Sequence, residues 1–417
     1  MNKTEVAVVG AGPYGLSIAA TLATKRINHV VFGTPMQFWA ETMPPNMALK
    51  TSWATAGFTD PSAPYSLIDH AVGAGLPHDE SAPIRLENFV AYGREFQRRS
   101  VPTLNRNHVA EIRKLDKSFL LSTEDGGMTE ARRVVVATGI GEHRFIPEQL
   151  RSLPAQFLSH SATCGPFERF EGKDVIVIGG GASAIDTAAA LRQFGAHPTV
   201  VARRKQVRYQ SPGNVKRSLI DRIRAPDTKL GPGWRALAVT TMPSLFHAMP
   251  ARFRIMVVRR FLGPAASWPA RQFVEGHVPF VLGAHVIGAE ISSDKVVVDL
   301  SVDGAMHQLS ADHVIAATGY RVEMARYSLL ATKLREQLAL EDGSPALSSK
   351  FESSVPGLFF AGTVAANAFG PMFRFVSGSA YAADKIAGHI ASELNSAKGS
   401  ERLPVRKIAT GPAGKSA

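Results

Sequence analysis

Two glycine-rich turns, each placed between a short apolar strand and a helix, constrain the fold of this chain more than any other feature. The first turn, GAGPYG at Gly10–Gly15, follows the apolar run VAVV, and the second, GGGASA at Gly179–Ala184, follows VIVI. In such a unit the first glycine permits a tight turn, the second lets a phosphate approach the backbone, and the third position lets helix and strand pack closely. We therefore expect an α/β fold with two Rossmann-like dinucleotide-binding units.

The first unit offers a set of candidate binding residues around its turn: Gly10, Gly12, Pro13, Tyr14 and Gly15. The backbone amides at the start of the helix would face a bound phosphate. An acidic residue normally ends the second strand of such a unit and binds the ribose hydroxyls. Here that strand reads HVVFGT, so Gly33 stands where the acid is expected. The sequence therefore predicts that another group holds this ribose.

The second unit has its own candidates: Gly179, Gly181, Ala182, Ser183 and Ala184. The strand after its helix ends in VVARRK and carries no carboxylate. Arg203 and Arg204 suit a 2′-phosphate in charge and in geometry, because a guanidinium can donate two parallel hydrogen bonds. This pattern favours NADPH over NADH. In the alternative interpretation, both arginines are solvated loop charges.

Two further signals bracket the second unit, VVVATG at Val134–Gly139 and IAATGYR at Ile315–Arg321. Each is an apolar strand that ends in Ala-Thr-Gly, as expected where a chain passes between two nucleotide units and its backbone lies close to a cofactor. A third apolar segment that ends in glycine, GLFFAG at Gly357–Gly362, follows them in the chain. These segments add candidate cofactor-binding residues, namely Thr138, Gly139, Thr318, Gly319 and Gly362.

The cysteine content limits the chemistry. Cys164 is the one cysteine of the 417-residue chain, so the chain cannot form an internal disulfide, a CxxC redox pair or a cysteine-rich zinc site. We expect no metal. The first residues lack the pattern of a secretory signal and no apolar stretch is long enough for a membrane span, so we expect a cytoplasmic protein.

The basic residues gather in one segment. Between Arg203 and Arg260 there are 14 lysines and arginines and two acids. The net charge of this segment, +12, equals that of the whole chain. We favour a lid of short helices, over 219–223 and 253–262, whose charges guide NADPH and an anionic substrate. Peripheral contact with an anionic membrane is one alternative and nucleic acid another, although we expect no nucleic acid because no recognised binding motif is present.

At this point the chain resembles the single-component flavin-dependent monooxygenases that use FAD and NADPH, including the FMO-like enzymes and the lysine and ornithine N-hydroxylases. Trp39 and the segment MALKTSWATAGFTDP at Met47–Pro61 are similar to the part that crosses the reactive face of the flavin in those families. PIRLENFVAY at Pro83–Tyr92 is similar to the N-hydroxylase pattern. FGTPMQFW at Phe32–Trp39 and FGP at Phe369–Pro371 resemble the bacterial FAD-dependent urate hydroxylases.

The resemblance implies a domain organisation. We expect an FAD-binding domain in two parts, 1–165 and 313–395, and an inserted NADPH-binding domain, 166–312, which carries a basic helical insertion at 203–275. The last residues, 396–417, read as a disordered basic tail that follows a helix over 379–394. Strands over 109–112, 118–122 and 133–137 read as a meander. Trp39 and Val109 complete the candidate cofactor-binding residues. The sequence carries no signal for an oligomeric state.

The resemblance also implies a reaction. NADPH reduces FAD, reduced flavin captures O₂ as a C4a-(hydro)peroxide, and a small anionic or amino-acid-like substrate is hydroxylated, with urate as one candidate. The alternatives are an NADPH-dependent reductase that passes electrons to a quinone or a protein, and a non-enzymatic flavoprotein whose basic segment binds an acidic partner.

The candidate catalytic residues are Lys50, Ser52 and His160. FMO-like enzymes have an asparagine about where Lys50 falls, so this lysine departs from their pattern and would suit an anionic substrate. An exposed loop lysine is the alternative. His160 could hydrogen-bond the flavin or the nicotinamide, or it could be a structural histidine.

Overall fold

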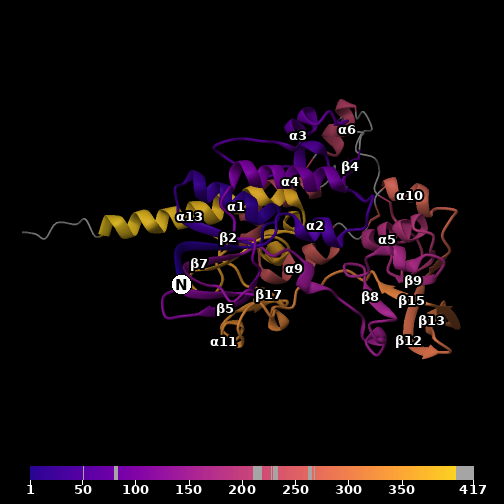
Figure 1. Cartoon of the computed structure of the whole chain (residues 1–417). Helices are drawn as coiled ribbons and strands as arrows, with labels where there is room; N and C mark the ends of the chain where they lie inside the picture. The colour runs from indigo at the N-terminus through magenta and orange to yellow at the C-terminus, as the bar shows by residue number, and fades with distance from the viewer. Residues whose placement is uncertain are drawn as a thin grey trace, which may run out of the picture.

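The chain folds into two lobes, which Figure 1 shows side by side. The computed structural model describes residues 1–49, 51–78, 83–209, 218–226, 228, 233–261, 265–266 and 268–400. The lobe with β1, β7, α1 and α13 contains segments from both ends of the chain, and the other lobe contains α5, β9 and β15 (Figure 1). The expectation of an α/β fold with two Rossmann-like units, the second inserted into the discontinuous first, is confirmed.

The first sheet joins both ends of the chain. Its strands run in the order β2-β1-β7-β6-β5, and β18 also pairs with β7. β1 pairs in parallel with β2 and β7, and Val6–Val9 at its end are buried, as expected for a parallel strand covered on both faces. The strands are β1 (Asn2–Val9), β2 (His29–Phe32), β5 (Val109–Lys114), β6 (Phe119–Thr123), β7 (Met128–Val136) and β18 (Leu358–Phe360). β5, β6 and β7 form the antiparallel meander that the sequence predicts.

The second sheet is parallel throughout, in the order β11-β10-β9-β15-β8. Its strands are β8 (Leu158–His160), β9 (Asp174–Ile178), β10 (His197–Ala202), β11 (Phe280–Leu282) and β15 (His313–Ala316). A three-stranded antiparallel sheet follows it in the same lobe, with β12 (Ala284–Ser292), β13 (Lys295–Val302) and β14 (Ala305–Ala311). In β13 the alternating Val296, Val298 and Leu300 are all buried. Two short pairs, β3 (Ala48–Leu49) with β4 (Ile84–Arg85) and β16 (Leu340–Glu341) with β17 (Ser344–Pro345), complete the strands.

The helices of the first lobe come from both ends of the chain, and three of them lie between β2 and β5 in the sequence. The helices are α1 (Pro13–Thr24), α2 (Gln37–Thr42), α3 (Leu67–Gly73), α4 (Leu86–Ser100), α11 (Thr332–Glu336), α12 (Ala366–Phe369) and α13 (Ser379–Ser400). α4 is not among the predicted helices, although Leu86, Phe89, Val90 and Phe96 follow helical spacing and are buried. α13 is expected to end at residue 394 but continues to Ser400, so the start of the tail predicted to be disordered is helical. Residues 401–417 lie outside the described ranges.

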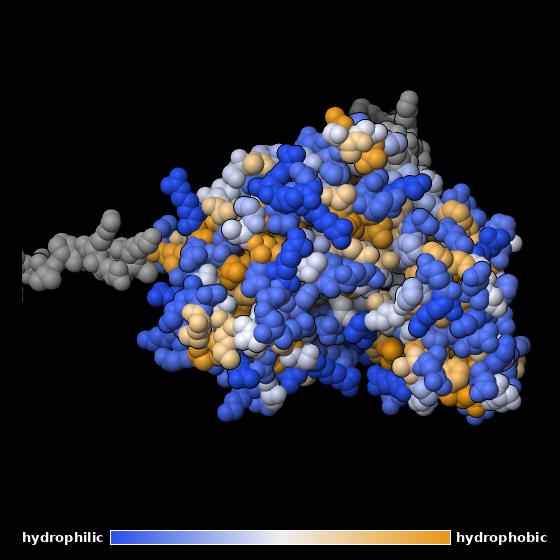
Figure 2. Space-filling model, in the orientation of Figure 1, coloured by the Kyte–Doolittle hydropathy of each residue, from blue (hydrophilic) through white to orange (hydrophobic). Residues whose placement is uncertain are grey.

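The basic insertion divides between the two lobes. Its helices are α6 (Leu219–Arg224), α7 (Trp234–Thr241), α8 (Pro243–Ala248), α9 (Ala251–Arg260) and α10 (Trp268–Val274). α8 and α9 pack on α12 of the first lobe, whereas α10 packs on α5 (Ala182–Gln193) of the second. Apolar side chains gather around α6 at the top of Figure 2, where Ile220 and Ile223 are exposed. Over the described ranges, every helix is too short or too polar to cross a bilayer.

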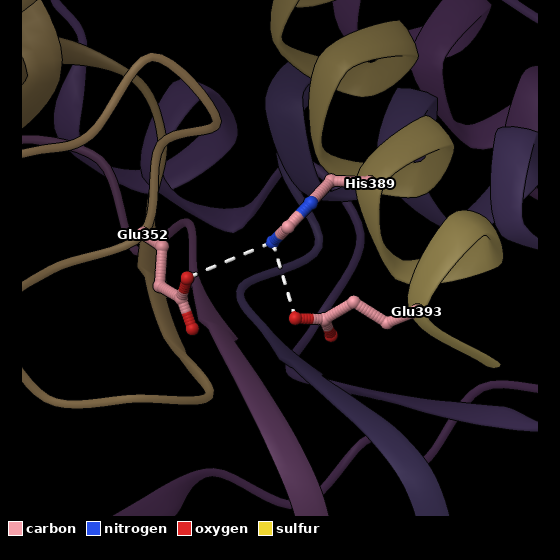
Figure 3. Close-up of side chains that lie close together, drawn as sticks. All are labelled: Glu352, His389 and Glu393. Atoms are coloured by element: carbon pink, nitrogen blue, oxygen red, sulfur yellow. Dashed lines mark ion pairs between the residues drawn. The ribbon is translucent and has the colours of Figure 1, made fainter. Parts of the chain in front are cut away.

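A network of charged side chains ties α13 to the first sheet. His389 on α13 lies between Glu352 and Glu393, with Nε2 3.6 Å and 3.3 Å from their nearest carboxylate oxygens (Figure 3). Their ligand atoms all lie within 4.8 Å of one another, a spacing that a metal ion would accept. However, Arg133 donates to Glu393, and the Gly357 backbone N–H donates to Glu352. Because both carboxylates already have donors, we assign these side chains to an ion-pair network.

Arg133 provides a test of that network. Its guanidinium contacts Glu5 and lies 2.9 Å from Glu393, and its side chain is only 16% exposed. Arg133→Met would leave both carboxylates without this cation, so we expect a loss of about 2 kcal/mol in the free energy of unfolding, less than for a fully buried pair. Thermal unfolding measures this loss. The neighbouring Arg132 is 73% exposed and lies 3.8 Å from Glu5, so Arg132→Met is the matched control and should change little. Equal midpoints for both variants would contradict the assignment.

Candidate functional site

A cavity of about 320 Å³ opens at the carboxyl ends of β1, β2, β7 and β18. Ligands of open α/β sheets bind at this edge, outside the ends of the strands. Most of the first unit's predicted residues line it, namely Gly10, Gly12, Pro13, Tyr14, Gly33, Trp39, Val109, Thr138, Gly139 and Gly362. The cavity is therefore the candidate nucleotide site of the first lobe.

The first turn is shaped by a close approach of backbone to backbone. A Cβ atom placed on Gly10 would lie 2.4 Å from the carbonyl oxygen of Ala137, at the end of β7. A Cβ atom on Gly15 would lie 1.8 Å from the carbonyl oxygen of Gly10. Gly12 differs, because a Cβ atom there would meet nothing within 4 Å. Gly10 and Gly15 are thus required by packing, whereas Gly12 leaves space beside the N-terminus of α1 that a phosphate group would fit.

The second turn repeats this arrangement. A Cβ atom on Gly179 would lie 2.3 Å from the carbonyl oxygen of Ala317, which follows β15. α5 begins at Ala182 with Gly181 as its N-cap, so Ser183 and Ala184 lie in the first turn of the helix. The two Ala-Thr-Gly segments therefore have the same place in both units, with the alanine carbonyl against the first glycine of the turn.

The basic residues predicted for a 2′-phosphate lie directly after β10. Arg203 is exposed and Arg204 is half-buried. The next residue, Lys205, pairs with Asp303 at 2.8 Å and is thereby occupied. Arg203 and Arg204 therefore stand at the edge of the second sheet where a dinucleotide ribose is expected.

Tyr14 connects the first turn to the C-terminal segment of the cavity wall. Its hydroxyl donates to the backbone carbonyls of Phe373 and Phe375, at 3.1 Å and 2.8 Å. Burial raises the pKa of this phenol, so it stays protonated and available as a donor. Tyr14 thus holds the wall segment 373–376 against the start of α1.

The two crossover segments contact each other. The Phe145 backbone N–H donates to Gly319 at 3.0 Å, and the Thr318 hydroxyl donates to the Phe145 carbonyl. Thr138 shares a 2.5 Å hydrogen bond with the hydroxyl of Tyr327. These bonds place Thr318 and Gly319 at the junction between the lobes, while Thr138 lies on the wall of the cavity.

His160 lies at the same junction but is occupied by backbone. Its Nε2 lies 3.0 Å from the Gly319 carbonyl and its Nδ1 accepts from the Ala162 N–H at 3.1 Å. Burial holds the pKa of His160 below its ordinary value, so the ring is neutral, with Nε2 as the donor. Both ring nitrogens are therefore used, and of its two predicted roles the geometry fits the structural one.

The remaining catalytic candidates lie on the segment that follows β3. Lys50 lies outside the described residues. Ser52 precedes a 3₁₀ turn, Trp53–Thr55, and its hydroxyl is 3.0 Å from that of Thr55. Ser52 does not line the cavity of the first lobe.

The cavity also has wall residues that the sequence analysis does not select. Thr34 and His108 lie near Gly33, and Phe373 and Phe375 lie on the wall segment that Tyr14 holds. The position of Thr34, directly after Gly33 at the end of β2, is a sequence signal that could have identified it. His108 directly precedes the selected Val109, but no local pattern indicates that it meets Thr34, which lies 74 residues away in the chain.

Cys164 is buried. Desolvation raises the pKa of its thiol to about 11, so the thiol is protonated at neutral pH and is a poor nucleophile. Thiol chemistry therefore has no support in the described part of the chain.

Comparison with known proteins relates the chain to flavin- and pyridine-nucleotide-dependent enzymes. A family model described as pyridine nucleotide-disulphide oxidoreductase matches residues 7–226, a little over half of the chain. A ferredoxin–NADP reductase from Ignicoccus hospitalis is 28% identical over 203 residues, which is 48% of this chain and 57% of that protein. The chain thus spans just over half the length of this relative.

Solved structures share the fold over nearly its whole length. An ornithine N-hydroxylase from Kutzneria sp. 744 has a TM-score of 0.73 at 18% identity, covering 94% of this chain and 100% of that one. A bacillithiol disulfide reductase from Bacillus cereus has a TM-score of 0.62 at 22% identity, with the same coverage of 94% and 100%. At these identities the likeness concerns the fold.

Proposed function

Since the chain belongs to the pyridine nucleotide-disulphide oxidoreductase family, we propose that it is an FAD-dependent, NADPH-consuming monooxygenase. We propose that it uses O₂ to hydroxylate a small anionic or amino-acid-like molecule. FAD would occupy the cavity of the first lobe, and NADPH would bind at the second turn.

The observation that carries this proposal is the pair of equivalent turns in a chain with one buried cysteine. Two dinucleotide units support electron transfer between two bound nucleotides. A disulfide of this chain cannot receive the electrons, because Cys164 has no partner cysteine. The acceptor is therefore external, and the resemblance of the sequence to the N-hydroxylases favours O₂. The fold shared with an ornithine N-hydroxylase is consistent with this choice.

The residues of the cavity fit the parts of FAD. The N-terminus of α1 and the open space at Gly12 suit the pyrophosphate. The chemistry that bound FAD supplies is the transfer of electrons from NADPH to O₂. Trp39 packs edge-on against the buried Phe89, with ring centroids 4.9 Å apart, and gives the cavity an apolar wall that excludes water.

The basic insertion would support the wall segment 373–376. Arg254 on α9 is buried and donates to the backbone carbonyls of Asn367 and Ala368, at 3.1 Å and 3.2 Å. Arg374, on the cavity wall, donates to the carbonyl of Val258 at 3.2 Å. We therefore favour the interpretation of the insertion as a lid, with α8 and α9 fixed on the first lobe.

FAD binding can be separated from folding by two glycine variants. Gly12→Val should fold normally and lose FAD, because its side chain would enter space that only a ligand uses. Gly15→Val should instead destabilise the fold by about 3 kcal/mol or more, because it would clash with the Gly10 carbonyl. Flavin absorbance and thermal unfolding measure the two effects. Normal FAD content in a folded Gly12→Val protein would refute the assignment of the first turn.

The preference for NADPH should depend on Arg203 and Arg204. Replacing both with alanine removes the charge-assisted hydrogen bonds to the 2′-phosphate, so the preference over NADH should fall by about ten- to a hundred-fold. Steady-state kcat/KM with each nucleotide measures the change. Lys205→Ala is the matched control, since Lys205 already pairs with Asp303. An unchanged ratio in the double variant would mean that both arginines are loop charges.

Oxygenation itself is tested by supplying ¹⁸O₂ together with NADPH and a panel of acceptors that includes ornithine, lysine and urate. Mass spectrometry should find one labelled oxygen atom in the product for each NADPH consumed. Lys50→Met removes the charge at nearly constant length, so it should keep FAD and NADPH oxidation. It should nevertheless form about tenfold less labelled product and more hydrogen peroxide, if a single ion pair holds the substrate. Full coupling in this variant would mean that Lys50 does not bind the substrate.

A second candidate function is that of an NADPH-dependent flavoprotein reductase. The relationship to a ferredoxin–NADP reductase and the basic insertion, which would suit an acidic protein partner, favour it. Anaerobic assays with ferredoxin and with a quinone distinguish the two functions. Rapid anaerobic turnover without labelled product in the ¹⁸O₂ assay would establish the reductase and exclude the monooxygenase.

A further inference from the structure

The first unit lacks the acidic residue that holds a dinucleotide ribose. β2 ends at Phe32, and Gly33 follows at the expected position of the acid. Gly33 has φ +118°, a conformation that residues with a side chain rarely adopt, and a Cβ atom there would lie 3.5 Å from the Ala11 nitrogen. A carboxylate at this position would therefore be strained, and the ribose must be bound by neighbouring groups.

Two side chains meet at this end of the cavity. Thr34 and His108 both line it, and the Thr34 hydroxyl oxygen lies 3.4 Å from Nε2 of His108. Both residues are only half-buried, so their polar atoms can reach a ligand. They come from distant segments, one directly after β2 and the other directly before β5.

Backbone hydrogen bonds fix this meeting. The Asn105 N–H donates to the Val31 carbonyl at 2.8 Å, and the Gly33 N–H donates to the Asn105 carbonyl at 2.9 Å. The chain before His108 is thus held along the end of β2. Another polar wall residue, Gln37, donates its side-chain amide to Glu41 at 2.9 Å and is thereby occupied.

We propose that Thr34 and His108 together bind the vicinal hydroxyls of the adenosine ribose of FAD, in place of the missing carboxylate. This inference rests on the proposed function, since it requires FAD in the cavity. A threonine hydroxyl both donates and accepts, and an imidazole ring carries two nitrogens that can take part in hydrogen bonds. The pair can therefore satisfy both ribose hydroxyls without a negative charge.

The test titrates the apoprotein with FAD and with an FAD analogue whose adenosine ribose lacks the 2′-hydroxyl. Flavin fluorescence measures the binding of each. Thr34→Val and His108→Phe should each weaken FAD binding by roughly five- to tenfold, the loss expected for one hydrogen bond. With the analogue, at least one of the two variants should lose clearly less affinity than it loses with FAD. The ribose hydroxyl that the substituted side chain would bind is already absent from the analogue. Thr34→Ser keeps the hydroxyl and should bind FAD like the parent.

Gln37→Ala is the matched control on the same wall, and it should bind FAD and the analogue in the parent's ratio. The assignment of the pair is overturned if Thr34→Val and His108→Phe both bind FAD as tightly as the parent. It is also overturned if each variant loses as much affinity for the analogue as for FAD. In both cases the proposed function stands. A folded parent that binds neither flavin overturns the proposed function and this inference with it. Thermal midpoints of all variants identify any loss that comes from misfolding.

Discussion

The fold depends on a contact between two backbones that occurs once in each lobe. The carbonyl of Ala137 lies against Gly10, and the carbonyl of Ala317 lies against Gly179, so closely that no side chain fits between them. Each contact brings the residue after a strand, β7 or β15, against the first glycine of a glycine-rich turn. The chain passes from one lobe to the other directly after each of these contacts. The hydrogen bonds of Phe145 to Gly319 and Thr318 join these two crossovers.

Two helices of the basic insertion pack on the first lobe, although the insertion belongs to the second unit in sequence. α8 and α9 pack on α12, and Arg254 bonds the carbonyls of Asn367 and Ala368. The ring of His247 also stacks on Phe369, with centroids 4.8 Å apart. A segment that follows the second glycine-rich turn in sequence thus packs on the first lobe.

The family relationship and the chemistry of this chain differ in one respect. The family is described by disulphide chemistry, whereas this chain has one cysteine, buried and with a raised thiol pKa. What the chain retains of the family is the pair of nucleotide units.

The sequence by itself determined the two turns, the meander of β5 to β7 and the absence of an acid at Gly33, because each is encoded within a few neighbouring residues. It also selected the glycines that line the cavity, and Tyr14 and Trp39 among its aromatic residues. Only the tertiary structure decided that His108 meets Thr34, that His160 uses both nitrogens on backbone, and that α9 supports the first lobe. These features join residues far apart in the chain, and their meeting depends on how strands and helices pack. No local pattern carries that information.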